Sequence, residues 1–250
     1  MKLAFLRKFV GKGFTKIWPF GKFYELILNV IRPEYVYVEG YKLYIPKKRY
    51  FLSDSLFLTG KFEPNQTECI KSLLNEGDTV LDIGANIGYY TLIMSKLVGK
   101  KGRVYAFEPE PRNLELLRKS LKINHINNVK LFPFALSNKN TKDNFFINKV
   151  NAGGHSLIKT SESERFIEVE VKKLDAILIK NKIKLIKIDT EGSEDNVLLG
   201  AKITIKKNKP IIILEYSEDR IKTPKVKDIL NQGKPILFDI YDDIQENSIK

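Results

Sequence analysis

The stretch VLDIGANIGYYTL, from Val80 to Leu92, decides the fold expected for this chain. Apolar residues lead into Asp82, after which Gly84 and Gly88 precede a helix-like segment. A glycine turn between a first strand and its helix lies at the carboxyl edge of an open α/β sheet, where such folds bind ligands. The stretch therefore predicts an α/β fold with a ligand site at this turn. We expect the glycines to let a bulky ligand approach the backbone.

The glycine spacing argues against two common nucleotide motifs. Three residues separate Gly84 from Gly88, and no third glycine completes the G-x-G-x-x-G pattern of dinucleotide-binding folds. The Gly-Lys-Ser/Thr of a P-loop does not follow either. The next predicted strand ends at Glu108, whose carboxylate can accept hydrogen bonds from both ribose hydroxyls of an adenosine. Since Asp82 suits a cationic amino group, the two carboxylates together predict a nucleoside pocket.

Strand-like and helix-like segments alternate along most of the chain. The first predicted segments are strands over 79–83, 103–108 and 129–136, with helices over 89–98 and 111–124. This alternation predicts a mostly parallel, twisted sheet with helices on both faces. Residues 139–170 interrupt the pattern with two short strands around a polar loop, and the alternation then resumes.

Composition excludes several classes of protein and site. The chain has 250 residues, 43% of them apolar and 29% charged, which is ordinary for a globular protein. Its single cysteine, Cys69, and its two histidines exclude a disulfide framework and a multi-cysteine zinc cluster, so carboxylates must supply most acid–base chemistry. No run approaches the roughly 20 apolar residues of a membrane span. Lysines interleaved through the N-terminus differ from a secretory signal, so we expect a cytoplasmic protein.

The N-terminal part of the chain is its most basic part. Net charge is +13, and residues 1–50 hold eleven Lys/Arg against three Glu, a net charge of +8. Alternating Tyr, Val and Leu around Glu39-Gly40 predict a hairpin within this part. A basic segment with aromatic residues suits peripheral contact with an anionic membrane, phosphorylated substrates or nucleic acid. The alternative is a solvated, lysine-rich helix face that caps the core, and both remain open.

Several motifs, taken in order, resemble the FkbM family of S-adenosylmethionine-dependent methyltransferases. They are VLDIGANIGYYTL, VYAFEPEPRNLELLRKSLKIN, FALS, NAGGHSL, LDAIL and LIKIDTEGSEDNVLLGA. The resemblance covers about residues 60–216. It implies a Rossmann-like class I methyltransferase fold over residues 51–250, after a basic extension over 1–50 that holds the hairpin. The chain ends soon after PILFDIYDD, so the final antiparallel strand usual in this fold is expected to be short or missing.

The resemblance also implies a set of cofactor-binding residues. The methionine end of the cofactor would lie against Asp82, Gly84, Asn86 and Gly88, with Glu108 on the ribose. The adenine ring would lie near Ala135, Leu136 and Ser137. GKFEPNQTE resembles the segment that covers the cofactor, which makes Glu63 a candidate partner for its amino group.

Two carboxylates at the end of a predicted strand are the candidates for the chemistry. Asp189 and Glu191 in IKIDTEG point the same way if the strand continues that far. Methyl transfer to a hydroxyl needs an aligned oxygen and a group that accepts its proton. We therefore expect Asp189 to be the base or to position the acceptor, with Glu191 alongside. His155, after Gly153-Gly154, is an alternative base or a surface histidine.

Other readings of this region stay open. A Mg²⁺ ion held by the two carboxylates is the less favoured alternative, and no metal site is assigned. Ser193 reads as a helix cap followed by acidic residues of the first turn, so it is left out of the site. Lys187 is either buried near the ligand or exposed at an edge.

We therefore expect an S-adenosylmethionine-dependent enzyme that methylates a hydroxyl on a carbohydrate, glycolipid or small metabolite. Nucleic-acid methylation is the less favoured alternative, because the basic excess lies outside the core and no RNA-binding module is recognisable. A non-catalytic scaffold that binds the cofactor is the alternative from another class.

Overall fold

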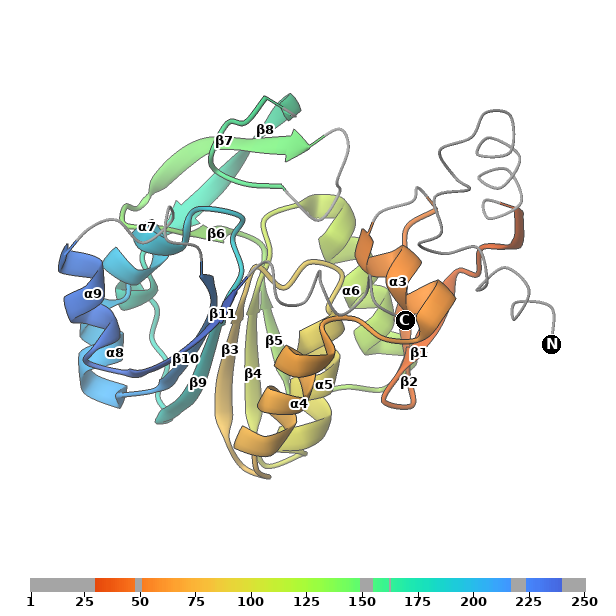
Figure 1. Ribbon diagram of the computed structural model, residues 1–250, viewed down its shortest axis with the longest axis horizontal. Coiled ribbons are helices and arrows are strands. Elements are labelled where there is room, and N and C mark those ends of the chain that lie inside the picture. The colour runs from red at the N-terminus through yellow and green to blue at the C-terminus, as the bar shows by residue number, and fades with distance from the viewer. Residues whose placement is uncertain (1–29, 48–50, 149–154, 162, 217–223, 240–250) are drawn as a thin grey trace.

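A computed structural model describes residues 30–47, 51–148, 155–161, 163–216 and 224–239 of the chain. Its centre is a six-stranded sheet in the order β11-β10-β9-β3-β4-β5, in which all neighbouring strands are parallel (Figure 1). The strands are β3 (Thr79–Ile83), β4 (Arg103–Phe107), β5 (Val129–Phe132), β9 (Ile183–Ile188), β10 (Ile211–Tyr216) and β11 (Lys234–Asp239). The predicted parallel α/β fold is confirmed, and the described part of this sheet contains no antiparallel strand.

The order of the strands places a ligand crevice between β3 and β9. From β3 the chain continues to β4 and β5 on one side, and it later returns to β9 on the other side of β3. Open α/β folds bind ligands outside the carboxyl ends of the strands at such a switch point. The glycine turn after β3 and the residues after β9 therefore border the same crevice.

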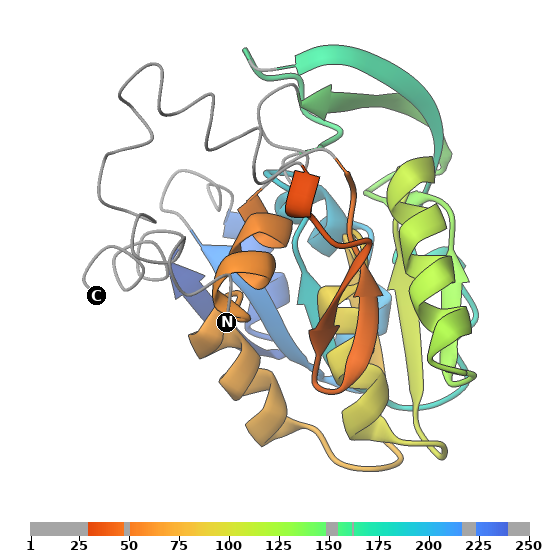
Figure 2. The same ribbon diagram turned by 90° about the vertical axis from the view of Figure 1, so that its right-hand side faces the viewer.

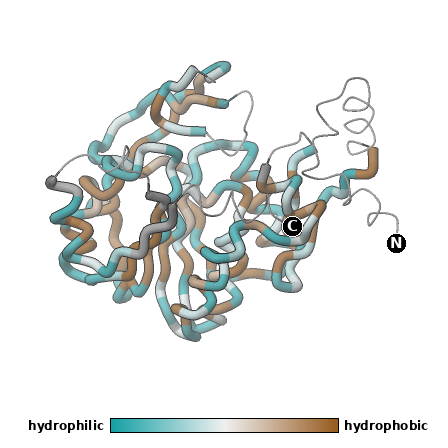
Figure 3. The backbone as a smooth tube through the Cα atoms, viewed as in Figure 1, coloured by the Kyte–Doolittle hydropathy of each residue, from teal (hydrophilic) through white to brown (hydrophobic). Residues whose placement is uncertain are grey.

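Two layers of helices cover the sheet because both of its faces are apolar. Every residue of β3 is buried. Val80 packs with α4 (Pro64–Leu73) and α5 (Tyr89–Val98) on one face, where α6 (Pro111–Ile123) also lies. Leu81 and Ile83 pack on the other face with α7 (Glu194–Leu199), α8 (Lys202–Asn208) and α9 (Pro224–Leu230). Figure 3 shows hydrophobic segments running through the central strands. No helix in the described part of the chain combines the length and apolarity needed to cross a bilayer.

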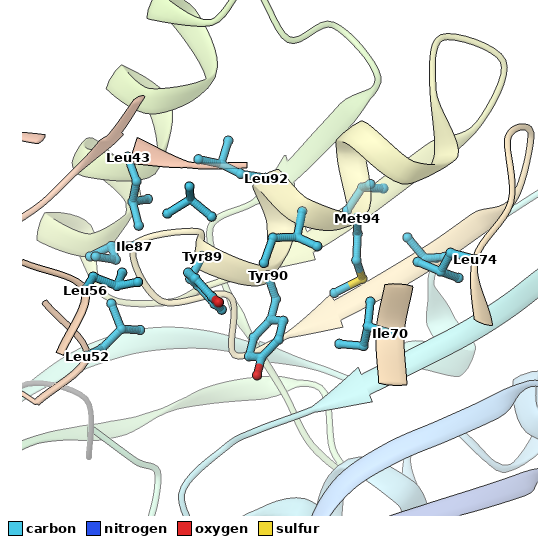
Figure 4. Packing of buried hydrophobic residues seen from close by; sticks show 14 of the residues in the cluster. Leu43, Leu52, Leu56, Ile70, Leu74, Ile87, Tyr89, Tyr90, Leu92 and Met94 are labelled. Atoms are coloured by element: carbon cyan, nitrogen blue, oxygen red, sulfur yellow. The ribbon is translucent and has the colours of Figure 1, made fainter. Parts of the chain in front are cut away.

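The predicted hairpin is present and packs on this core. β1 (Tyr35–Val38) and β2 (Tyr41–Tyr44) are antiparallel, and Glu39 and Gly40 both have positive φ, as a type I′ turn requires. The hairpin lies beside α5 and α6 (Figure 2). Leu43 joins one cluster with residues of α4, α5 and α3 (Phe51–Thr59) (Figure 4). The predicted boundary at residue 50 thus runs between segments that share a core. The basic segment 1–29 lies outside the described residues.

The interruption after β5 forms a separate three-stranded sheet. β7 (Thr141–Asn148) and β8 (Ser163–Lys172) are antiparallel, and β6 (Ala135–Leu136) pairs parallel to β8. The prediction of one strand over 129–136 is wrong, because β5 and β6 belong to different sheets. Pro133 lies between them, and its missing N–H and fixed φ interrupt a strand. LDAIL begins with a short 3₁₀ turn, η2 (Leu174–Ala176).

Candidate active site

The glycine turn after β3 brings protein segments together. Gly84 and Gly88 have φ values of 81° and 98°. A Cβ at residue 84 would lie 1.8 Å from the carbonyl oxygen of Asp189, and one at residue 88 would lie 2.3 Å from Cδ1 of Leu117. These glycines are therefore needed for the turn after β9 and for α6 to approach. Protein atoms thus occupy the Cβ side of both glycines, and contact of their backbone with the cofactor stays a prediction.

Lys187 is buried at the switch point between β3 and β9, so of the two positions that the sequence left open, the exposed one is wrong. It is paired with Asp82 in the register of β9 and β3. Its Nζ lies 2.9 Å from Oδ2 of Asp189, and the residue is 2% exposed. Burial alone would lower the pKa of Lys187, but the charges of Asp189, Asp82 and Glu63 more than offset this effect and raise its pKa. Lys187 is therefore the cation of a cluster with three carboxylates.

Tyr90 connects this lysine to the start of α4. The Nζ of Lys187 lies 4.5 Å from the centroid of the Tyr90 ring, a cation–π contact. The Tyr90 hydroxyl donates a 2.6 Å hydrogen bond to Oε2 of Glu63, which begins α4 with a φ of 40°. Burial and the Glu63 carboxylate raise the pKa of Tyr90 well above its usual value, so the hydroxyl stays a donor. Figure 4 shows Tyr90 beside the apolar residues of α5 and α4.

Asp82 has one carboxylate oxygen without a partner. Its Oδ2 accepts a 2.5 Å hydrogen bond from the hydroxyl of Thr91, whereas Oδ1 is buried and makes no hydrogen bond with the described residues. Burial raises the pKa of Asp82, and this effect is opposed by the Lys187 charge and by the Thr91 hydrogen bond. An unsatisfied buried acceptor costs about 1 to 3 kcal/mol, so it marks a place for a donor. With three carboxylates to one ammonium, the cluster fits a cationic ligand such as the methionine end of S-adenosylmethionine.

Glu108 joins the glycine turn to the start of α6. Its Oε2 accepts a 2.8 Å hydrogen bond from the backbone N–H of Asn86, and its Oε1 accepts one of 2.9 Å from the backbone N–H of Glu110. Burial raises the pKa of Glu108 to about 7, although these donors oppose the effect. Nδ2 of Asn113 also donates to Oε1, at 3.5 Å, so the lone pair that remains free lies on Oε2, where a ribose hydroxyl could donate. The ribose assignment stays a prediction.

The turn after β9 differs from the sequence expectation. β9 ends at Ile188 and Glu191 has a φ of 53°, so Asp189 and Glu191 do not continue the strand and the condition for a common direction of their side chains is not met. Glu194 holds the turn, because its Oε1 accepts hydrogen bonds from the backbone N–H groups of Thr190 (3.0 Å) and Gly192 (3.1 Å).

Glu194 shows what the sequence pattern missed in this turn. The sequence pattern predicts only an acidic residue in the first turn of a helix, which implies no contact with the preceding loop. Ser193 does take the N-cap position of α7, but its side chain makes no capping hydrogen bond.

The three-stranded sheet reaches this turn through Ser156. The Ser156 hydroxyl donates a 3.2 Å hydrogen bond to the carbonyl oxygen of Thr190. Its neighbour His155 accepts a 3.0 Å hydrogen bond at Nδ1 from the backbone N–H of Asn148. The role of His155 as a base stays a prediction, and Gly153-Gly154 lies outside the described residues.

The residues expected near the adenine ring are buried just beyond the carboxyl end of β5. Ala135 packs with the three-stranded sheet, whereas Leu136 packs with the cluster that covers the sheet on the α7 side. The backbone N–H of Ser137 donates to the carbonyl oxygen of Lys172 at 2.9 Å. Contact of these residues with adenine stays a prediction. Within the described residues no group of three or more His, Cys, Asp or Glu side chains is arranged to hold a metal ion.

Known proteins that resemble the chain are methyltransferases. The sequence model of the Methyltransferase FkbM domain matches residues 82–234. The 2-O-methyltransferase NoeI of Sinorhizobium fredii is 30% identical over 171 residues, which cover 61% of this chain and 69% of that protein. A probable cobalt-precorrin-6B C(15)-methyltransferase of Saccharolobus solfataricus is 36% identical over 120 residues, which cover 43% of this chain and only 58% of that protein.

A solved structure carries the same family name. It is the methyltransferase FkbM from Methylobacillus flagellatus, which is 19% identical with a TM-score of 0.45; the match covers 72% of this chain and 46% of that one. The family assignment rests on the domain match, which spans more than half of the residues. The chain therefore belongs to the FkbM family of S-adenosylmethionine-dependent methyltransferases.

Proposed function

We propose that the protein transfers a methyl group to a hydroxyl of a carbohydrate, a glycolipid or another small metabolite, in the crevice between β3 and β9. The observation that carries this proposal is the cluster of Asp82, Asp189 and Glu63 around the buried Lys187. It combines a place for a cationic cofactor with a carboxylate at the open edge of the sheet. The 2-O-methyltransferase name of the NoeI relative supports an oxygen acceptor.

The cofactor side of the site would be formed by residues of three elements. The unpartnered Oδ1 of Asp82 would accept a hydrogen bond from the amino group, with Glu63 close by as a second anion. Glu108 would accept a hydrogen bond from a ribose hydroxyl. S-adenosylmethionine, when bound, supplies a methyl group that is already activated for transfer. These residues therefore need only to bind and orient the cofactor.

The acceptor side depends on Asp189. Lys187 holds its Oδ2, while its side chain is 25% exposed and its Oδ1 makes no hydrogen bond with the described residues. That oxygen is available to accept a hydrogen bond from an acceptor hydroxyl and to take its proton. Fixing an acceptor in line can remove roughly 7 to 11 kcal/mol of a barrier, and a positioned base adds about 10²- to 10⁴-fold.

The proposal is tested by the position of the transferred methyl group. The full chain is incubated with S-adenosylmethionine and a panel of glycans, glycolipids and small polyols, and the products are fragmented by mass spectrometry. We expect a methyl ether on oxygen, formed by the wild type and largely lost in Asp189→Asn. A methyl group found only on nitrogen or carbon would contradict the proposal. Cofactor binding without turnover on the panel or on RNA would support the scaffold alternative.

A further inference from the structure

A second pocket lies at the opposite edge of the parallel sheet, where the strands begin. Its volume is about 350 Å³, within the usual range of small-molecule sites. Four segments line it, at the starts of β3, β9 and β11 and before β10 (Figure 1). The lining residues are Gly77, Asp78, Thr79, Lys182, Ile183, Lys184, Asn208, Lys209, Ile211 and Lys234.

Four of these lining residues are lysines, and none of them makes an ion pair with a described residue. Other exposed lysines of the described surface, such as Lys122 and Lys202, make none either, so what distinguishes these four is that they line one pocket. The one carboxylate in the lining is Asp78, whose Oδ2 already accepts a 2.9 Å hydrogen bond from a backbone N–H. Like charges in one pocket repel each other, and an anion between them would remove that repulsion.

An irregularity in the pairing of β3 with β9 affects the position of Lys184. The pairing of β3 with β9 steps from Thr79–Ile183 to Val80–Leu185, so Lys184 is an extra residue without a partner on β3. Such bulges re-aim a side chain and are over-represented next to functional sites. Lys184 is also only half-buried at this position, within reach of solvent and of a ligand.

The preference for cations at the carboxyl ends of helices explains only one of the four lysines. Lys209 ends α8 in the left-handed conformation, with a φ of 48°, and cations are favoured at the carboxyl ends of helices. Lys182 and Lys184 lie at the start of β9, and Lys234 begins β11, so no helix end explains them. Asn208 is used structurally, since its Oδ1 accepts a 2.9 Å hydrogen bond from the backbone N–H of Ile183.

We infer that this pocket binds a ligand with at least two adjacent phosphate charges, such as a pyrophosphate group, independently of the methyl-transfer site. Lysine binds phosphate as a point charge, and four such charges on separate segments suit a ligand larger than a single orthophosphate. The phosphates can belong to a soluble molecule or to a lipid headgroup.

Calorimetric titration of the full chain with pyrophosphate at low salt tests the inference. We expect Lys184→Gln combined with Lys234→Gln to weaken pyrophosphate binding by 10-fold or more. The matched control combines Lys122→Gln with Lys202→Gln, which removes the same charge at exposed positions outside the pocket, and should change affinity by less than about twofold. Equal weakening in both doubles, or no binding to the wild type, would overturn the inference.

Two further measurements complete the design. Affinity for S-adenosylhomocysteine should be unchanged in both doubles, which shows intact folding and separates this inference from the proposed methyl transfer. Sedimentation with phosphatidylcholine vesicles, with and without phosphatidylinositol 4,5-bisphosphate, which carries two adjacent phosphates, distinguishes the source of the phosphate. Binding that needs this lipid and the pocket lysines, and that pyrophosphate displaces, supports a lipid phosphate. Pyrophosphate binding without such sedimentation supports a soluble ligand.

Discussion

The charged side chains at the two edges of the parallel sheet differ in burial and in pairing. At the carboxyl edge, Asp82, Lys187 and Glu108 are 1%, 2% and 4% exposed, and each contacts another polar group of the site. At the amino edge, Lys182, Lys209 and Lys234 are exposed and make no ion pair with described residues.

Burial decides whether removing a charged side chain affects folding as well as ligand binding. A buried charge must be paired to be tolerated, so removing its partner affects folding as well as binding. An exposed lysine is solvated by water, so its removal affects only what binds there. The difference predicts that substitutions at the carboxyl edge have large, coupled effects and that those at the amino edge have small, separable ones.

The largest effect is expected at Asp189. Asp189→Asn should lower turnover by about 10²- to 10⁴-fold, because the amide keeps the shape but cannot take a proton. Affinity for S-adenosylhomocysteine, measured by calorimetry, should stay within a few-fold. Glu191→Gln is the control from the same turn and should reduce turnover less. Loss of cofactor affinity would place Asp189 in the cofactor pocket instead, and turnover lost on chelation and restored by Mg²⁺ would make it a metal ligand.

The next largest effect is expected at Lys187. Lys187→Met leaves Asp82 and Asp189 without their buried cation, and breaking a buried pair costs about 3 to 5 kcal/mol. Urea unfolding measures the free energy of unfolding. Lys234→Met, the matched variant of the amino edge, should change it by no more than about 0.5 kcal/mol. Similar losses of unfolding free energy in the two variants would contradict the predicted difference between the edges.

Glu108 should give the carboxyl edge a distinctive pH dependence. Its pKa is raised from 4.5 to about 7 in the folded protein, so the folded state binds more protons than the unfolded state in that interval. The resulting stabilisation is full below about pH 4.5 and is lost as the pH rises through about 7, a change on the order of 1 to 3 kcal/mol.

The measurement compares unfolding free energies of the wild type and of Glu108→Gln between pH 4.5 and 8. The difference should fall with rising pH, while Lys234→Gln should follow the wild type. Because hydroxyl donors favour the ionised carboxylate, S-adenosylhomocysteine should bind the wild type more tightly as the pH rises through 7. A pH-independent difference would remove the assignment of this pKa to Glu108.

The smallest effect is expected from the basic N-terminal segment. We propose that it attaches the enzyme to anionic surfaces, with each cation contributing on the order of 1 kcal/mol near lipid. Exchanging Lys8, Lys12 and Lys16 for Gln should weaken sedimentation with anionic vesicles, and salt should weaken it further. Cofactor affinity and turnover on a soluble acceptor should not change. Wild-type protein that ignores such vesicles at low salt would contradict the membrane proposal.

The elements next to the glycine turn were predictable because their patterns are strong. β3 and α5 have the predicted bounds, and α6 ends one residue earlier than predicted. The structure also brings Glu63, Asp82 and Asp189 into one cluster around Lys187, while their roles toward cofactor and acceptor stay predictions. Apolar periodicity fixes which face of such elements is buried, and short connections fix their neighbours.

The remaining features depend on contacts between segments far apart in the sequence. Lys187 lies between two isoleucines, a pattern that fits an exposed or a buried side chain until the three carboxylates around it are known. The role of Glu194 depends on a left-handed residue, Glu191, that folds the turn back onto it. The role of Gly84 depends on the approach of Asp189.

That approach has a consequence for how acceptor preference can change over evolution. The backbone N–H of Asp189 donates to the carbonyl oxygen of Ile83, and its own carbonyl oxygen fills the place of a side chain at Gly84. Any shift of Asp189 therefore also displaces the glycine turn after β3. The sheet of β6, β7 and β8 is separate from the parallel sheet and meets the turn after β9 through Ser156, so its changes are not tied to the glycine turn in this way. Substrate diversification in this scaffold should therefore accumulate in that sheet, while the two turns at the switch point stay fixed relative to each other.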